Sequence, residues 1–261
     1  MTILEKIFQT KRDEVERSKS ILSPAELRAF AKDSPRRLGF LQALRNAPLK
    51  PALIAEVKQA SPSQGQIYNG EFNPVEIAKT YEASGAECLS VLTDEPYFKG
   101  SPEYLRAVRR EVHIPLLRKD FIFDEYQIDE ALVWGADCIL LIVAGLEVER
   151  LRSLFDAAKE RGVDVLVEVH NEPETEIALG LSPDLIGINN RDLSTFETDI
   201  ETTRRLINLI PDHIFKVSES ALHAHDDVAR VAGYGADAVL IGTAFCGSPD
   251  IGAKVREVMG R

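Results

Sequence analysis

Residues 135–142 read Gly-Ala-Asp-Cys-Ile-Leu-Leu-Ile: a turn-forming residue, an acid and then a short apolar run. The same order recurs at residues 85–92 (Gly-Ala-Glu-Cys-Leu-Ser-Val-Leu) and at residues 235–241 (Gly-Ala-Asp-Ala-Val-Leu-Ile), and residues 182–188 stand where a fourth copy falls. The acidic positions 87, 137, 184 and 237 are about 50 residues apart, so one copy covers two strand–helix units. Four copies of a two-unit repeat favour a closed barrel, and the glycines suit the left-handed turn that ends a helix.

Short apolar runs alternate with longer helical segments from residue 52 onward. Strands that alternate with helices predict right-handed βαβ units and a parallel sheet. Eight units in about 210 residues fit a (β/α)8 TIM barrel, and a doubly wound open sheet is the alternative. The predicted strands are Ala52–Lys58, Cys88–Thr93, Pro115–Asp120, Asp137–Ile142, Asp164–Val169, Leu185–Asn190, Phe215–Ser220 and Ala238–Gly242.

Two segments lie outside this alternation. Residues 1–50 predict two or three helices, one of them with Ser23 as its N-cap and Pro24 at its first position. We interpret residues 1–261 as a single barrel domain in which residues 1–50 form an N-terminal helical extension that caps one barrel end or contacts the ligand. Residues 59–73 are many for a loop after a strand, which makes them a candidate lid over a site.

The composition excludes several classes of partner. The 261 residues carry a formal net charge of −11, which argues against nucleic acid as a partner. No apolar run reaches the roughly 18 residues that span a membrane. Cys88, Cys138 and Cys246 form no CxxC pair, so we expect reduced core residues in a cytoplasmic protein. We expect this protein to be a monomer that acts on a small molecule.

Charged residues gather where the predicted strands end, which is where barrel enzymes place their active sites. Side chains alternate between the two faces of a strand, so Glu56 and Lys58 point into the barrel if Val57 faces the helices. The same alternation directs further polar side chains to the barrel mouth: Lys119, Glu168, Asn189, Arg191 and Glu219. Arg118 and Asp120 fall on the opposite face, as structural partners. Buried charge must be paired, so a purely stabilising ion-pair network is the alternative to an active site.

Phosphate is the ligand that the last two loops predict, because barrels often bind it after strands 7 and 8. These loops read Glu219-Ser220-Ala221 and Ile241-Gly242-Thr243-Ala244, and their small residues let backbone N–H groups approach an anion. Simple tight turns are the alternative. His170 follows the fifth predicted strand, where it is placed to line the mouth.

Six motifs occur in one order between residues 54 and 220. They are residues 54–63 (IAEVKQASPS), residues 89–94 with 97–101 (LSVLTD, YFKGS), residues 117–121 (LRKDF), residues 166–169 (LVEV), residues 187–193 (GINNRDL) and residues 217–220 (VSES). Together they resemble the signature of the indole-3-glycerol phosphate synthase family, and the resemblance includes the helical N-terminal extension.

The resemblance implies a carboxy-lyase of tryptophan biosynthesis that uses neither cofactor nor metal. Its reaction converts 1-(2-carboxyphenylamino)-1-deoxyribulose 5-phosphate to indole-3-glycerol phosphate, with loss of CO2 and water. Ring closure needs a proton donor at the developing oxyanion, and the family's candidate is Lys119. Dehydration needs an acid, either Lys58 or Glu168, and a base, Glu56. We favour Lys58 as that acid, with Glu168 holding the lysines in position.

The resemblance also implies how the substrate is bound. Asn189 and Glu219 orient the polar cluster and the ribulose hydroxyls, and Arg191 holds the substrate carboxylate or the nearby loop. The residues implied against the anthranilate ring are Phe98, Phe121 and Leu193. Those implied at the phosphate are Ser61, Ser220, Ala221, Gly242 and Thr243.

Ala221 departs from the family, which usually has glycine there. A methyl group at this position is expected to fit only if φ is negative.

Two other functions stay open on the residues alone. A sugar-phosphate isomerase on the same barrel, such as phosphoribosylanthranilate isomerase, would share the phosphate loops but not two lysines with three carboxylates. A non-catalytic binder of a phosphorylated ligand has little use for inward carboxylates near an anion.

Overall fold

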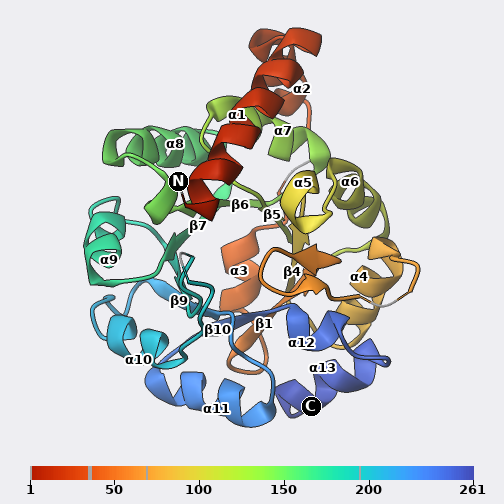
Figure 1. Cartoon of the computed structure of the whole chain (residues 1–261), viewed down its shortest axis with the longest axis vertical. Coiled ribbons are helices and arrows are strands. Elements are labelled where there is room, and N and C mark those ends of the chain that lie inside the picture. The colour runs from red at the N-terminus through yellow and green to blue at the C-terminus, as the bar shows by residue number, and fades with distance from the viewer. Residues whose placement is uncertain (1, 35–36, 69, 194) are drawn as a thin grey trace.

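The computed structural model describes residues 2–34, 37–68, 70–193 and 195–261. Eight parallel strands form a closed barrel in the order β1-β10-β9-β8-β7-β6-β5-β4 (Figure 1). Their bounds are β1 Ala52–Val57, β4 Cys88–Leu92, β5 Leu116–Lys119, β6 Cys138–Ile142, β7 Asp164–Val169, β8 Leu185–Asn189, β9 Phe215–Glu219 and β10 Ala238–Ile241. The predicted TIM barrel is confirmed, and the open-sheet alternative is wrong because β1 pairs with both β4 and β10.

A ring of helices surrounds the barrel (Figure 1). Their bounds are α4 Pro74–Ala83, α6 Pro102–Glu111, α7 Glu125–Trp134, α8 Val148–Glu160, α9 Glu172–Leu179, α10 Glu201–Ile207, α11 His225–Tyr234 and α13 Ile251–Met259. Shorter elements follow several strands: a hairpin of β2 Ala60–Ser61 and β3 Gly65–Gln66, then α5 Glu95–Phe98, the 3-10 helix η1 Val143–Gly145 and α12 Thr243–Cys246. No helix in the described part of the chain combines the length and apolar character needed to cross a membrane.

The repeat that predicted the barrel has a structural role at the amino end of the strands. Gly85, Gly135 and Gly235 have φ values of +88°, +91° and +106°, which confirms the predicted left-handed turns. The acid two residues later accepts a main-chain hydrogen bond from a neighbouring strand. Leu53 N donates to Glu87 over 2.7 Å, Leu116 N to Asp137 over 2.9 Å, and Lys216 N to Asp237 over 2.9 Å. These carboxylates therefore fix where neighbouring strands begin.

Two apolar layers enclose the strands, in the alternation that the sequence predicts. Leu53, Ala55 and Val57 pack outward with the helices, in one cluster of buried side chains. Ala52 and Ile54 pack inward, in a second cluster that fills the barrel. The three cysteines are buried and form no disulfide, as expected. This alternation determines which polar side chains reach the barrel mouth.

The N-terminal extension consists of α1 Ile3–Ile21, α2 Pro24–Lys32 and α3 Phe40–Arg45, and it contacts both barrel ends. Ser23 caps α2 as predicted. In α3, Phe40 and Leu44 are fully buried in the inner cluster, where they close the amino end of the barrel. At the other end α1 is fixed by Lys11, whose Nζ lies 3.0 Å from Asp94 and 3.1 Å from Asp120. The extension therefore caps one end and reaches the mouth at the other.

Candidate active site

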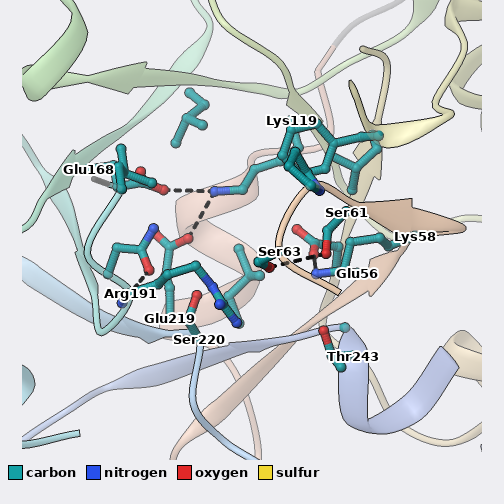
Figure 2. Close-up of a pocket in the computed structure, with 18 of the residues that line it drawn as sticks. Glu56, Lys58, Ser61, Ser63, Lys119, Glu168, Arg191, Glu219, Ser220 and Thr243 are labelled. Carbon is teal, nitrogen blue, oxygen red and sulfur yellow. Dashed lines mark hydrogen bonds and ion pairs between the residues drawn. The ribbon is translucent and has the colours of Figure 1, made fainter. Parts of the chain in front are cut away.

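A cavity of about 150 Å³ lies at the carboxyl end of the strands, and every residue predicted for the site lines it (Figure 2). The acid–base candidates are Glu56, Lys58, Lys119, Glu168, Asn189 and Glu219. The binding candidates are Ser61, Phe98, Phe121, Arg191, Leu193, Ser220, Ala221, Gly242 and Thr243. The paired strands end at the same level of the barrel. Residues up to 187 positions apart in the chain therefore line one cavity.

Lys119 lies at the centre of the cluster and bridges two carboxylates (Figure 2). Its Nζ is 2.8 Å from Glu168 Oε2 on β7 and 3.0 Å from Glu219 Oε2 on β9. Gly187 on β8, between those strands, leaves the space that Glu219 occupies, because a Cβ there would collide with Glu219 Oε1. The lysine is therefore held by two other strands, β7, which is separated from its own strand by β6 alone, and β9, which lies across the barrel.

Glu56 and Lys58 form a second acid–base pair on β1 and the residue just after it (Figure 2). Lys58 Nζ donates to Glu56 Oε1 over 2.5 Å, and Ser90 Oγ donates to Glu56 Oε2 over 3.2 Å. Gly242 leaves room for this carboxylate, since a Cβ there would lie 2.8 Å from Glu56 Oε1. Both residues line the same cavity as Lys119.

The buried charges of the cluster have shifted pKa values in opposite directions. Burial lowers the pKa of Lys119, but Glu168, Glu219 and Glu56 outweigh burial and raise it above its usual value. Burial raises the pKa of Glu168, yet Lys119 and His170 outweigh burial and hold it well below its usual range. For Glu219 burial prevails and raises its pKa to about 7. The cluster thus presents a protonated lysine, a firmly ionised carboxylate and a carboxylate that titrates near neutrality.

The loops after β9 and β10 form the end of the cavity where phosphate was predicted. Ser220 and Ala221 both adopt positive φ, +65° and +61°, so the main chain passes through the left-handed region where it lines the cavity. The expectation that alanine at 221 requires a negative φ is therefore wrong. Alanine has the smallest side chain with a Cβ and occupies the left-handed region at a modest cost. Thr243 begins α12 on the neighbouring loop.

An apolar wall lies beside the charges. The rings of Phe98 and Phe121 lie 5.9 Å apart, and Phe121 also contacts Phe8 of α1 edge-on at 5.8 Å. Asp94 Oδ1 accepts hydrogen bonds from Tyr97 N and Phe98 N and so holds α5. The salt bridge from Lys11 to Asp94 therefore connects the N-terminal helix to the aromatic wall.

Asn189 and Arg191 extend from the end of β8. Arg191 N donates to Asn189 Oδ1 over 3.0 Å, and the Arg191 guanidinium donates to Phe196 O over 3.0 Å. Arg191 thus supports its own loop while it faces the cavity. Arg118 and Asp120 pair with each other at 2.9 Å, as structural partners should, but Asp120 also pairs with Lys11 and lines the cavity, which the alternation of the strand did not predict.

Sequence reasoning missed two contributions to the site. Ile3, Leu4 and Ile7 of α1 line the cavity, and their spacing on one helix face was the available signal. His170 is expected from the sequence to line the mouth; it lines the neighbouring groove instead, and its Nε2 lies 3.3 Å from Glu168 Oε1. Within the described residues no group of three or more histidine, cysteine or acidic side chains is placed to hold a metal ion.

A closed parallel barrel with paired lysines and carboxylates at its carboxyl end defines an enzyme that works by proton transfer. The family model for indole-3-glycerol phosphate synthase matches residues 4–258. The chain is 47% identical to the indole-3-glycerol phosphate synthase of Roseiflexus sp. (strain RS-1), over 99% of this chain and 98% of the relative. It is 46% identical to that of Rhodospirillum rubrum over 99% of both. The chain belongs to the indole-3-glycerol phosphate synthase family, which decides between the enzyme classes left open above.

Solved structures of other enzymes share the fold. N-acetylmannosamine-6-phosphate 2-epimerase from Clostridium perfringens aligns with a TM-score of 0.61 at 15% identity, over 77% of this chain and 89% of that one. Thiamine phosphate pyrophosphorylase from Pyrococcus furiosus aligns with a TM-score of 0.61 at 17% identity, over 81% of this chain and 95% of that one. At such identities the likeness shows the barrel alone.

Proposed function

We propose that this chain closes an indole ring: it converts 1-(2-carboxyphenylamino)-1-deoxyribulose 5-phosphate to indole-3-glycerol phosphate, CO2 and water. The activity itself follows from membership of the family. The observation that carries the residue roles is the cavity in which Lys119 faces two carboxylates while Lys58 and Glu56 form a separate pair. Two separate acid–base pairs suit a reaction with two separate proton-donating steps.

In the first step Lys119 is the general acid. The ring carbon that carries the carboxylate attacks the ribulose carbonyl, and Lys119 Nζ donates a proton to the oxygen as its charge develops. The raised pKa of Lys119 keeps it protonated before the reaction. CO2 then leaves, and the electrons of the broken carbon–carbon bond restore the aromatic ring and the neutral amine.

In the second step Lys58 is the acid and Glu56 the base. Lys58 protonates the departing hydroxyl, which leaves as water, while Glu56 removes the proton from the adjacent carbon of the new ring. Their 2.5 Å contact supports direct return of that proton from Glu56 to Lys58. One further proton from solvent restores Lys119, which balances the loss of a carboxylate as neutral CO2. Glu168 holds Lys119 rather than acting as the acid, because its pKa lies far below neutrality.

The remaining cavity residues hold the substrate. Phe98, Phe121 and Leu193 supply an apolar slot for the anthranilate ring, whose flat face suits aromatic and aliphatic neighbours. Asn189, Glu219 and Arg191 face the ribulose hydroxyls and the carboxylate. The residues assigned to the phosphate are Ser61, Ser220, Ala221, Gly242 and Thr243, which lie together on the loops after β1, β9 and β10.

We further propose that residues 1–261 act as one domain and as a cytoplasmic monomer that binds neither nucleic acid nor membrane. Side chains of α1 and α3 are packed into the inner cluster of the barrel, which supports one domain. The net charge of −11 and three buried free thiols agree with this assignment.

Turnover of the purified protein tests the function. With 1-(2-carboxyphenylamino)-1-deoxyribulose 5-phosphate, we expect indole absorbance and fluorescence to appear, with one CO2 released per indole. The same rate is expected with and without EDTA. Absence of indole from a cooperatively folded sample would remove the proposal.

A further inference from the structure

His170 occupies a position between two carboxylates at the rim of the cluster. It follows β7 directly, and its side chain is 9% exposed. Its Nε2 lies 3.3 Å from Glu168 Oε1, and its Nδ1 lies 2.9 Å from Glu174 Oε2. The imidazole therefore joins a carboxylate of the active site to a carboxylate of α9.

The start of α9 holds Glu174 in place. Asn171 is the N-cap: its Oδ1 accepts from Glu174 N over 3.0 Å, and its Nδ2 donates to Glu174 Oε1 over 2.7 Å. His170 N donates to Glu174 Oε2 over 2.8 Å. Because this reciprocal cap fixes both the helix end and the Glu174 carboxylate, the imidazole ring has one orientation available.

Glu168 differs from Glu219 in how its two oxygens are used. Oε2 of each contacts Lys119, but only Glu168 has a cationic neighbour at its other oxygen, namely His170. Glu219 Oε1 is buried without a hydrogen-bond partner among the described residues, and His170 Nε2 makes no hydrogen bond there either, so its 3.3 Å approach to Glu168 is an ion-pair contact. An ion pair at the second oxygen favours the orientation in which Glu168 faces the lysine.

We propose that His170, oriented by Glu174 and the α9 cap, is a positioning residue that holds Glu168 against Lys119 as its permanent carboxylate partner. The inference rests on the proposed function of Lys119. His170 does not touch the reacting atoms, because it does not line the cavity and acts through Glu168. Its effect is to leave Glu219 as the partner that exchanges a proton near neutral pH.

The charges around the imidazole support this role. Burial lowers the pKa of His170, but Glu168 and Glu174 outweigh burial and raise it to about 10, so the ring is a cation at neutral pH. Lys119 and His170 are the cations that act on Glu168. Other titratable side chains line the groove of about 1190 Å³ beside His170: Glu5 and Arg12 of α1, Asp124, Glu147, Arg150, Arg191, Asp192, Glu197, Asp199 and Arg205.

Two substitutions at 170 separate charge from contact. The asparagine of His170→Asn is neutral and too short to contact Glu168. We therefore expect kcat to fall about tenfold, with KM changed less than about twofold. The acidic limb of the kcat/KM profile should move up by about one pH unit, because the carboxylates around Lys119 hold their proton more tightly. His170→Gln keeps a neutral donor at the position of Nε2, so it should recover part of kcat while the limb stays shifted.

Exposed His213 supplies the control, because His213→Asn removes a histidine far from the cluster and should leave kcat and the limb unchanged. A wild-type limb in both variants at 170 would overturn the inference, even if kcat fell, since lost packing alone does not change a titration. If His170→Asn fails to fold, His170→Gln decides.

Imidazole NMR signals test the inference without turnover. The His170 ring should stay protonated from pH 6 to about 9, and Glu174→Gln should lower its pKa. Titration of His170 near its ordinary value would overturn the inference. Absence of wild-type turnover, with His170 protonated throughout, would instead count against the proposed function alone.

Discussion

At the amino end of the barrel, the carboxylates of Glu87, Asp137 and Asp237 accept hydrogen bonds from main-chain N–H groups. At the carboxyl end, three buried glutamates face two lysines instead. A main-chain N–H does not exchange its proton in a reaction, whereas an ammonium group does. Acidic side chains therefore stabilise the strands at the amino end and take part in proton transfer at the carboxyl end. Substitutions at 119, 137 and 184 test whether these two roles are separate.

Removal of the central lysine should have the largest effect. Lys119→Met deletes the proton donor of ring closure, so kcat/KM should fall at least about 10²-fold. The measurement is the rate of indole fluorescence, with circular dichroism to show that the variant is folded. A rate equal to that of the wild type would remove Lys119 from its role.

Removal of an amino-end acid should cost stability. Asp137 is 4% exposed; its Oδ2 accepts from Leu116 N and pairs with Arg109 at 3.1 Å, and its Oδ1 accepts from Leu38 N over 2.7 Å. Asp137→Ala leaves Leu38 N and Leu116 N without this acceptor and Arg109 without its carboxylate, and it should destabilise the protein by about 3 kcal/mol. That loss lowers the unfolding midpoint by roughly 6–12 °C.

The fourth copy of the repeat provides a matched control. Asp184 holds the same repeat position, but its side chain is 54% exposed and pairs only with exposed Lys159. Asp184→Ala should change stability by less than about 0.5 kcal/mol. Equal losses from the substitutions at 137 and 184 would show that the buried N–H contacts do not matter.

Glu219 should set the acidic limb of the pH profile. Its pKa is about 7, and as a carboxylate it holds Lys119. As pH falls through 7 it gains a proton, so wild-type kcat/KM should decline below that pH. Glu219→Gln should reduce activity and abolish this limb. A limb near pH 7 that persists in the variant would assign the titration to another group.

The smallest effect is expected at the phosphate loop. Ala221 has φ +61°, so Ala221→Gly should relieve strain and raise stability by up to about 1 kcal/mol. Exposed Ala253 in α13 is the control, because glycine inside a helix should lower stability by a similar amount. Urea unfolding of both variants compares them, and a loss of stability at 221 would argue against strain.

Much of the fold could be predicted because its signals are local. The apolar runs and turn glycines gave each strand to within one residue at either end, and the alternation along β1 gave the direction of Glu56 and Lys58. The repeat predicted closure. The function of its acids was not predictable, because Glu87 accepts from Leu53 on a strand 34 residues earlier in the chain.

The site was predicted as a set of residues, but its electrostatics required coordinates. Glu168 and Glu219 look alike in the sequence, and their pKa values diverge because Lys119 and His170 outweigh burial at Glu168, whereas burial and the charge of Glu168 prevail at Glu219. The left-handed backbone at Ala221 depends on the loop around it, and the family's usual glycine at that position gave the wrong expectation for alanine. Packing of α1 over the mouth depends on Lys11 meeting two aspartates from different loops.

Turnover and unfolding, measured side by side on Lys119→Met and Asp137→Ala, test the separation of roles most directly. At a temperature where both variants are folded, Lys119→Met should have the lower kcat/KM by at least about 10²-fold, while Asp137→Ala stays within about twofold of the wild type. Asp137→Ala should have the lower unfolding midpoint. A wild-type kcat/KM in Lys119→Met would contradict the assignment of catalysis to the Lys119 cluster. An equally steep loss of kcat/KM in folded Asp137→Ala would show that the charges at the two ends do not have separate roles.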